Sequence, residues 1–397
     1  MKYSELHYER INVDEVKVVI SDIVKRFSDA KSVKEQISSI LELDKIGRDY
    51  ASYSSIASLN FSRDIYNEKA KAEKDYYDSI GPDMEECFNS FEKVLDNSIF
   101  KNELADKWGN KYLKDVETSL KTFDPKIKEM LKRETDLRNE YTKLTAGAKI
   151  EFDGKEYNLA GLGPFHSDKS RDVRKRSYEA RFNWFSQNSE SLDAIYDKLV
   201  KLRHKIAVTL GYENFIELGY MRMGRNDYGP DEVANFRKQI VENVVPVVKK
   251  LHDKKKEILG LDQLFFYDGI NFKDGDPKPK GAPEHLITEA QKMYRELSEE
   301  TGEFFDIMVN EELMDLVNRE GKRPGGFCTS FPSYDRPYIF SNFNGTDHDI
   351  TVLTHEAGHA FQCYSSKDQP LMGYIWPTME AAEIHSMSME FFTWPWM

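Results

Sequence analysis

Two histidines four residues apart constrain the fold of this chain more than any other feature of its sequence. His355 and His359 enclose the run His-Glu-Ala-Gly-His, in which Glu356 follows the first histidine. Side chains four positions apart leave the same face of a helix about one turn from each other, so a helix lets both imidazoles bind one metal ion. Glu356 then lies close enough to take a proton from a water molecule that the metal activates. This arrangement is typical of zinc hydrolases and predicts a helix across the motif.

The flanking residues support a helix, although two histidines on an ordinary helix would show the same spacing. Thr346 is the expected N-cap, and Asp349 stands three residues later, as in a capping box. Apolar residues then recur at helical spacing and give the segment an apolar side: Ile350, Leu353, Ala357, Ala360, Phe361 and Tyr364. We therefore expect the motif to lie on a helix that begins near residue 346.

A third ligand is expected from the next helix. A catalytic zinc site takes three protein ligands and keeps a fourth position for water. The segment that starts at Thr378 reads as a helix, and Glu380, Glu383, Met387 and Glu390 share one face of it because they are three or four residues apart. Such a face is either an acidic stripe on the surface or a set of carboxylates that faces a metal ion. The two phenylalanines that follow indicate burial, which favours the metal.

Four segments, in order along the chain, carry a resemblance to a known family. They are Lys322–Phe331, Pro337–Thr346, Leu353–Ala360 and Glu380–Glu390, with weaker similarity in Leu210–Tyr212 and Arg225–Tyr228. In these segments the chain resembles the oligoendopeptidase F branch of the thimet oligopeptidase-like (M3) zinc peptidases. Four linked motifs are far more specific than the histidine pair alone.

The resemblance implies a role for each residue of the motif. His355 and His359 are expected to bind one Zn²⁺ per chain, and Glu356 is expected to be the general base. In the family the third ligand is a glutamate that opens a Glu-x-x-Ser-x-x-x-Glu pattern, which favours Glu383 over Glu380.

Ser386 and Glu390 complete that pattern, and we expect them to lie just outside the metal ligands. Glu390 lies two turns beyond Glu383 on the same face. A carboxylate there could accept a hydrogen bond from a ligand histidine and so fix its tautomer and orientation.

Two short strands are expected just before the motif helix, at residues 326–331 and 338–343. In the family such a strand borders the cleft and pairs with the backbone of the substrate, a mode of binding that makes little demand on side chains. The expected substrate contacts are Gly326, Tyr338, Phe340 and Asn342. The alternative is a plain structural hairpin beneath the site.

The resemblance implies a mainly α, zincin-like fold, as in neurolysin and the oligoendopeptidases. Two helical lobes would flank a channel, with a small β-sheet next to the motif helix. A hairpin between Lys149 and Leu159, turned at Asp153-Gly154, is the best boundary in the sequence. We therefore expect an N-terminal helical lobe at residues 1–165 and a catalytic lobe at residues 166–397.

Local signals predict helices through most of the remaining chain. Helix starts are expected at Asn12 and Ser32, interruptions at Gly81-Pro82 and Gly229-Pro230, a helix end near Gly260, and a loop from Asp274 to Pro283.

Composition excludes several classes of function. The chain has 69 acidic and 56 basic residues in 397, a net charge of −13, which argues against a nucleic-acid partner. No apolar run approaches the ~20 residues of a membrane-spanning helix, and the start lacks the hydrophobic core of a signal peptide. Cys87, Cys328 and Cys363 are scattered and odd in number, as expected of free thiols in a reducing cytoplasm. We expect a cytoplasmic protein.

The end of the chain bears on activity. The last seven residues hold four aromatic side chains. Family members continue into a helical region with a His and Tyr group that stabilises the oxyanion, and nothing here matches it. Loss of such a donor typically costs about 3–4 kcal/mol of transition-state stabilisation. We therefore expect a fragment that lacks the C-terminal helical part of its catalytic lobe and hydrolyses peptides poorly.

Together these features predict a zinc-dependent metalloendopeptidase that hydrolyses short oligopeptides by metal-activated water. Two alternatives come from other classes. One is a catalytically silent protein that binds zinc or peptides, and the other is a helical scaffold in which the motif is a coincidence.

Overall fold

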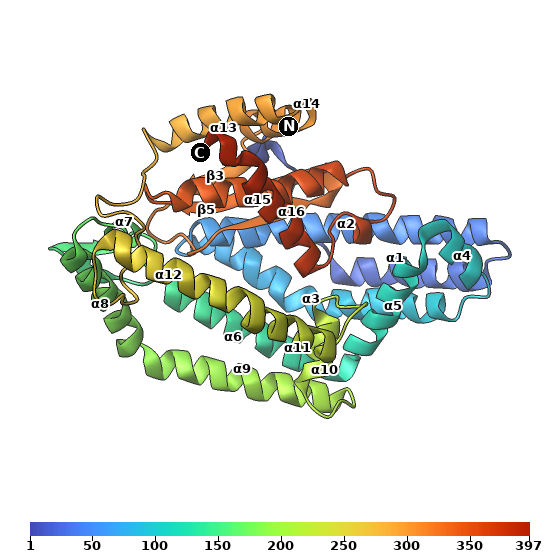
Figure 1. The fold of residues 1–397 in the computed structure, drawn as a ribbon. Coiled ribbons are helices and arrows are strands. Elements are labelled where there is room, and N and C mark those ends of the chain that lie inside the picture. The colour runs from blue at the N-terminus through green and yellow to red at the C-terminus, as the bar shows by residue number, and fades with distance from the viewer.

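The computed structural model describes residues 1–397 and is mainly helical, as predicted (Figure 1). The helices are α1 (Val13–Asp29), α2 (Val33–Arg63), α3 (Glu68–Asp96), α4 (Lys101–Trp108), α5 (Asn110–Thr122), α6 (Lys128–Ala146), α7 (Gly163–His166), α8 (Arg171–Gln187), α9 (Ser189–Thr209), α10 (Phe215–Arg222), α11 (Pro230–Gln239), α12 (Val245–Leu259), α13 (Pro283–Leu297), α14 (Glu299–Asn310), α15 (His348–Ser365) and α16 (Met379–Thr393). The strands are β1 (Ile150–Phe152), β2 (Lys155–Tyr157), β3 (Met314–Val317), β4 (Phe327–Phe331) and β5 (Arg336–Phe343).

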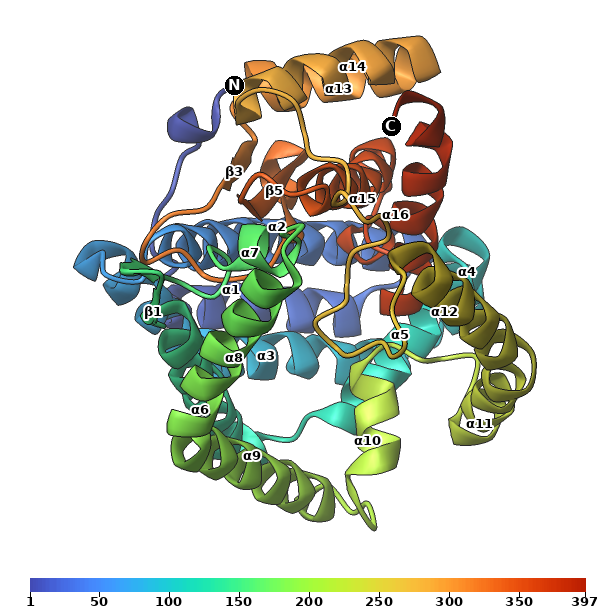
Figure 2. The ribbon, with the colours of Figure 1, turned by 60° about the vertical axis from the view of Figure 1, so that its left-hand side comes forward.

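The elements are arranged in layers that place the sheet and α15 near one side of the molecule. The α13–α14 pair lies outermost, followed by the sheet with α15, then α2 and α3, and α9 lies on the far side (Figures 1 and 2). Both chain ends lie beside the α13–α14 pair: the backbone N–H of Tyr3 donates to the carbonyl of Glu311, and the Trp396 indole donates to Glu296.

Capping residues set the helix boundaries that the sequence predicted. The side chain of Asn12 accepts from the first turn of α1, and the hydroxyl of Ser32 accepts from the backbone N–H of Glu35 in α2. Helix α11 begins at Pro230, and α12 ends at Gly260, whose φ of 65° only glycine adopts at little cost. The β1–β2 hairpin turns at Asp153-Gly154 as expected.

The predicted interruption at Gly81-Pro82 is wrong, because α3 continues through it. Proline inside a helix typically costs about 3 kcal/mol, since it removes a hydrogen bond and crowds the preceding turn. Tertiary packing compensates here: α3 contacts α1, α2, α5 and α6, and Ile80 and Met84 on either side of the proline are buried.

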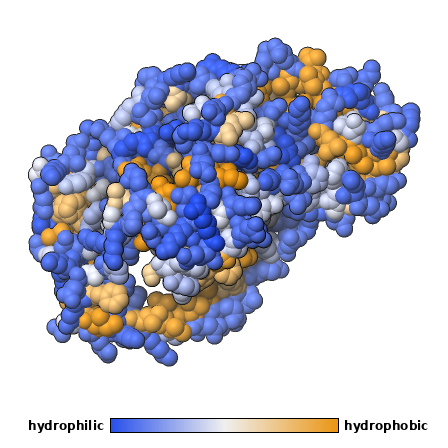
Figure 3. Space-filling model, turned by 90° about the horizontal axis from the view of Figure 1, so that it is seen from above, coloured by the Kyte–Doolittle hydropathy of each residue, from blue (hydrophilic) through white to orange (hydrophobic).

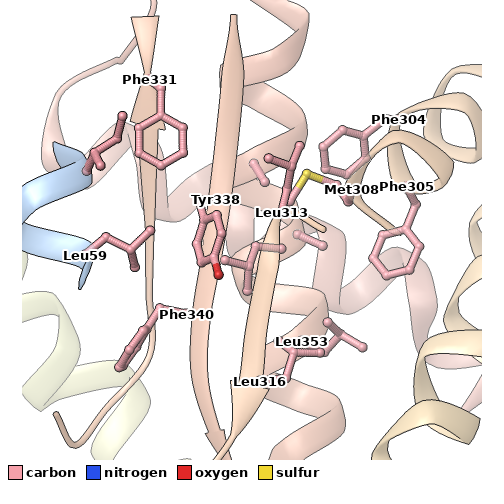
Figure 4. Packing of buried hydrophobic residues seen from close by; sticks show 14 of the residues in the cluster. Leu59, Phe304, Phe305, Met308, Leu313, Leu316, Phe331, Tyr338, Phe340 and Leu353 are labelled. Atoms are coloured by element: carbon pink, nitrogen blue, oxygen red, sulfur yellow. The ribbon is translucent and has the colours of Figure 1, made fainter. Parts of the chain in front are cut away.

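The sheet beside α15 has three strands in the order β3-β5-β4, one more than the sequence predicted. The central strand β5 runs antiparallel to β4 and parallel to β3. Figure 4 shows its packing: Leu59 reaches it from α2, Leu353 from α15 and Met308 from α14. The sheet is thus fixed on both faces and holds α15 in place.

The largest hydrophobic core joins the beginning and the end of the chain. Its buried residues come from residues 11–84 and 290–389, and α2 packs directly against β4. Two smaller cores lie around Ile23 and around Trp184. The boundary expected at residue 165 stays a prediction.

The surface is mostly hydrophilic with scattered apolar patches (Figure 3). Large apolar side chains are exposed mainly on α12 and on α16 with the residues that follow it. None of the helices combines the length and the apolar character needed to cross a membrane.

Candidate metal centre

The motif lies on α15, as predicted, but the start of this helix differs from the expectation. It begins at His348, with Asp347 in the N-cap position. The hydroxyl of Thr346 donates to the side chain of Asn344 and caps nothing. Asp349 accepts instead from the backbone N–H groups of Asn344 and Gly345, at 3.0 and 2.7 Å. The carboxylate therefore ties the incoming loop to the first turn.

Three predicted metal ligands come together between α15 and α16. The rings of His355 and His359 lie 4.9 Å apart and nearly perpendicular. The Glu383 Oε2 atom lies 3.2 Å from His355 Nε2 and 3.6 Å from His359 Nε2. Two atoms bound to one tetrahedral zinc at about 2.0–2.1 Å lie about 3.4 Å apart. The two histidines and the glutamate therefore fit a zinc ion.

The neighbours of these groups orient them. The Glu390 Oε1 atom lies 2.7 Å from His355 Nδ1, on the side of the ring away from Glu383. The hydroxyl of Ser386 donates to Glu383 Oε2 at 2.9 Å. Both residues thus lie where the Glu-x-x-Ser-x-x-x-Glu pattern suggested, one holding a histidine and the other holding the carboxylate.

Glu380, the rejected alternative ligand, has another partner. Its Oε1 atom accepts from Arg225 Nε at 2.7 Å, and Arg225 lies over the ring of Tyr220. The carboxylate therefore ties the start of α16 to the loop after α10. The structure brings Glu383, and not Glu380, to the two histidines.

Glu356 is buried next to the metal ligands. Only 6% of its surface is exposed, and its Oε2 atom has no hydrogen-bond partner. Burial raises the pKa of this carboxyl to about 7, with His355 lowering it and Glu383 raising it further. A group that titrates near neutrality suits general acid–base chemistry, since it both accepts and releases a proton readily.

Gly358, which the sequence analysis passed over, lets the two helices approach. A Cβ atom at this position would lie 2.7 Å from the Cα atom of Ser386 and 2.9 Å from the carbonyl oxygen of His385. Only glycine therefore fits where α15 crosses α16. The signal was present in the sequence as a glycine inside the motif, but its meaning depends on a helix that comes later in the chain.

Two of the expected substrate contacts lie at the site. A Cβ atom at Gly326 would lie 3.2 Å from Glu356 Oε1, so the backbone there passes directly beside the carboxylate. Asn342 donates to the carbonyls of Arg323 and Gly325, both at 2.8 Å, and so fixes the loop that leads to Gly326.

The other two expected contacts require correction. Tyr338 and Phe340 are 1% and 0% exposed, and their rings pack in the core beneath the sheet, as Figure 4 shows. Their strand is also the central one, paired on both sides, so it has no free edge for a substrate. The strand at residues 338–343 was predicted, but its pairing with a third strand, β3, was not.

Comparisons with known proteins agree with this geometry. The family description "Peptidase M3 N-terminal domain" matches residues 3–123, and "Peptidase family M3" matches residues 165–395. The solved structure of PZ peptidase A with an inhibitor is 46% identical and superposes with a TM-score of 0.98, over 100% of this chain and 71% of the other.

Curated relatives match at lower identity. An oligoendopeptidase F homolog of Borreliella burgdorferi is 26% identical over 231 residues, which are 55% of this chain and 36% of the relative. The chromosomal oligoendopeptidase F of Lactococcus lactis subsp. cremoris is 23% identical over 267 residues, 64% of this chain and 40% of the relative. The chain thus spans about two fifths of the length of these curated relatives.

Proposed function

We propose, since this chain belongs to peptidase family M3, that it is a zinc-dependent endopeptidase that hydrolyses short oligopeptides. The observation that carries the proposal is the convergence of His355, His359 and Glu383, with ligand atoms within 4.8 Å of one another. The buried carboxyl of Glu356 beside them supports it. The names of the relatives, oligoendopeptidase F, support short peptides as substrates.

His355, His359 and Glu383 would hold the zinc ion. When bound, zinc polarises a carbonyl group and lowers the pKa of a water molecule toward neutrality. By accepting the hydrogen of His355 Nδ1, Glu390 would leave Nε2 free to bind the ion. Ser386 orients the carboxylate of Glu383 through its hydrogen bond to Oε2.

Glu356 would carry the proton during hydrolysis. It accepts a proton from the attacking water and then passes it to the leaving amine. Its Oε2 atom has no hydrogen-bond partner in the protein and is therefore free to accept that proton.

The substrate backbone would lie along Gly326 and the outer edge of β4. That strand is at the edge of the sheet and has no strand on its other side. An extended peptide can add to such an edge through main-chain hydrogen bonds. Gly326, next to Glu356, would then face the bond to be cleaved.

Metal analysis and cleavage of a quenched fluorescent peptide, with and without a chelator, test the proposal. We expect one zinc per chain and cleavage that the chelator abolishes. Glu356→Gln should keep the zinc and lose most turnover, typically 100- to 10,000-fold for a general base. Zinc without cleavage would agree with either the silent binding protein or the poor hydrolysis expected from the sequence, and cleavage at the native rate by Glu356→Gln would refute the role of that residue. The cytoplasmic location stays a prediction.

A further inference from the structure

A polar cavity lies beside the candidate active site, between α6, α8 and the first turns of α15. Its volume is about 480 Å³, within the range typical of small-molecule sites. Its lining includes Gly326, which borders Glu356, and Val352, one helical turn before that carboxylate. The cavity therefore adjoins the reacting groups through the backbone at Gly326.

The charged side chains of this cavity are basic, although the whole chain has a net charge of −13. Arg181 and Arg323 line it together with two histidines. Its one carboxylate, Asp349, is buried and accepts backbone N–H groups of the preceding loop. That carboxylate is therefore not available to neutralise the arginines.

Both guanidinium groups lack a carboxylate partner. The charge of Arg323 faces the ring of Phe327 at 5.6 Å. The side chain of Arg181 donates to the carbonyl oxygen of Leu159 at 3.3 Å. Arg181 is half-buried and Arg323 is exposed, and both remain free to pair with an anion that enters the cavity.

A neutral hydrogen-bonding group borders the same space. The ring of His166 stacks on Tyr178 at 4.0 Å, and its Nε2 atom is buried without a partner. Burial, and then the charge of Arg181, lowers the pKa of His166 to about 4. The imidazole is therefore neutral at physiological pH and adds no charge of its own to the cavity.

We propose that this cavity binds a carboxylate of the oligopeptide through Arg181 and Arg323 while the bond beside Glu356 is cleaved. The fork of an arginine matches the two oxygens of a carboxylate, and such pairs are stronger than neutral hydrogen bonds. The carboxylate comes either from the C-terminus of the peptide or from an Asp or Glu side chain. The inference rests on the proposed function, since it places the ligand by its distance from Glu356.

Binding, rather than turnover, tests the inference independently of the proposed activity. The Glu356→Gln variant, loaded with zinc, is titrated with a labelled peptide as the free acid and as the C-terminal amide, by fluorescence anisotropy. The third peptide has the C-terminal amide and an internal Asp. The fourth is identical except that Asn replaces this Asp. In one of these two pairs, we expect the peptide with the carboxylate to bind about 10–100-fold more tightly than its neutral match. The pair that differs identifies the source of the carboxylate.

Arginine variants in the same background decide which groups are responsible. Arg323→Gln and Arg181→Gln should each remove most of the preference for the carboxylate and leave binding of the neutral peptide unchanged. Arg323→Lys should restore part of the preference, because it keeps the charge and loses the fork. Arg133→Gln is the matched control, since Arg133 lies on α6 outside the cavity and pairs with Glu140.

Two results would overturn the inference. One is equal binding of the charged and neutral peptides, or no binding at all. The other is a preference that survives in both Arg181→Gln and Arg323→Gln. If the chain shows no cleavage that a chelator abolishes but still prefers the carboxylate peptide, only the proposed activity is refuted.

Discussion

The chemistry of this chain depends on a few side chains whose partners fix their direction. Glu390 holds His355 from the far side of its ring, and the hydroxyl of Ser386 donates to Glu383. Metal ligands supported in this way need little rearrangement on binding, which lowers the entropic cost of forming the site. Different partners likewise distinguish Glu383 from Glu380, although both lie on one face of α16.

Zinc retention should distinguish Glu383 from Glu380. Glu383→Ala removes an oxygen that lies within 3.6 Å of both histidines, so we expect a loss of zinc affinity beyond the roughly 10–100-fold typical of outer partners. Glu380→Ala breaks only the pair with Arg225 and should retain one zinc per chain. The two variants are compared by titration with a competing chelator. Equal zinc loss in both would contradict the assignment.

Sequence reasoning at this scale succeeded where the motif itself specifies geometry. The spacing of His355 and His359 dictates a shared helix face, and the pattern that Glu383 opens places a carboxylate on the facing helix. It failed for Tyr338 and Phe340, because the sequence does not show that both faces of β5 are covered. That covering depends on α2 and α14, whose contacts are distant in sequence.

At the scale of elements, the site depends on how closely α15 and α16 approach. Local signals placed both helices, because caps, prolines and apolar spacing act within a few residues. They could not place strand β3 or the continuity of α3 through Pro82, since both are decided by tertiary packing. The close crossing of α15 and α16 is another feature of this kind.

Gly358→Ala should loosen the crossing and weaken the site. The added methyl group meets the backbone of Ser386 at 2.7 Å, and backbone atoms yield less than flexible side chains. Overpacking of this kind typically costs about 1–3 kcal/mol, and any shift of α16 moves Glu383. We expect a lower free energy of unfolding and weaker zinc binding. Gly269→Ala is the control, because a Cβ atom there meets nothing within 4 Å. Equal behaviour of the two variants would contradict the role of the crossing.

Asp315 joins three segments around the sheet. On β3, it accepts from Arg63 at the end of α2, and from Arg319 and Lys322 in the loop that leads to β4. Burial opposes its ionisation, but the hydrogen bonds from Arg319 and Lys322 outweigh it and hold the pKa of Asp315 well below its ordinary value of 3.8. The carboxylate therefore stabilises the fold as long as it is ionised.

Asp315→Asn should destabilise the chain in a way that depends on pH. Removing one partner of a buried charge network typically costs about 3–5 kcal/mol. Because the folded-state pKa of Asp315 is lowered, its contribution is complete above pH 3.8 and is lost as the pH falls below that value. Urea unfolding of both proteins should therefore show a large difference near neutrality that shrinks in acid below pH 3.8. A difference that stays constant across this range would contradict the ionic origin.

At the scale of the whole molecule, the candidate site is built on a core that the two ends of the chain share. The sheet that carries Gly326 packs on α2, and α15 packs on the sheet. Sequence reasoning divided the chain at residue 165 because a hairpin and the family pattern suggested it. Residues 11–84 and 290–389 contribute to one hydrophobic core, and local sequence patterns do not predict such long-range packing.

A chain of residues 166–397 alone should therefore fail to fold cooperatively. Without α2 and α3, the apolar face of the sheet, including Phe331, Tyr338 and Phe340, would be exposed to water. Burial of such side chains contributes about 1.5–3 kcal/mol each, so exposing these three removes about 5–9 kcal/mol, which is comparable to the typical total stability of a domain. We expect no sharp thermal transition by circular dichroism, binding of a dye that detects exposed apolar surface, and no stoichiometric zinc. A cooperative transition together with one bound zinc would show instead that the catalytic lobe is an independent domain, and would support the predicted boundary.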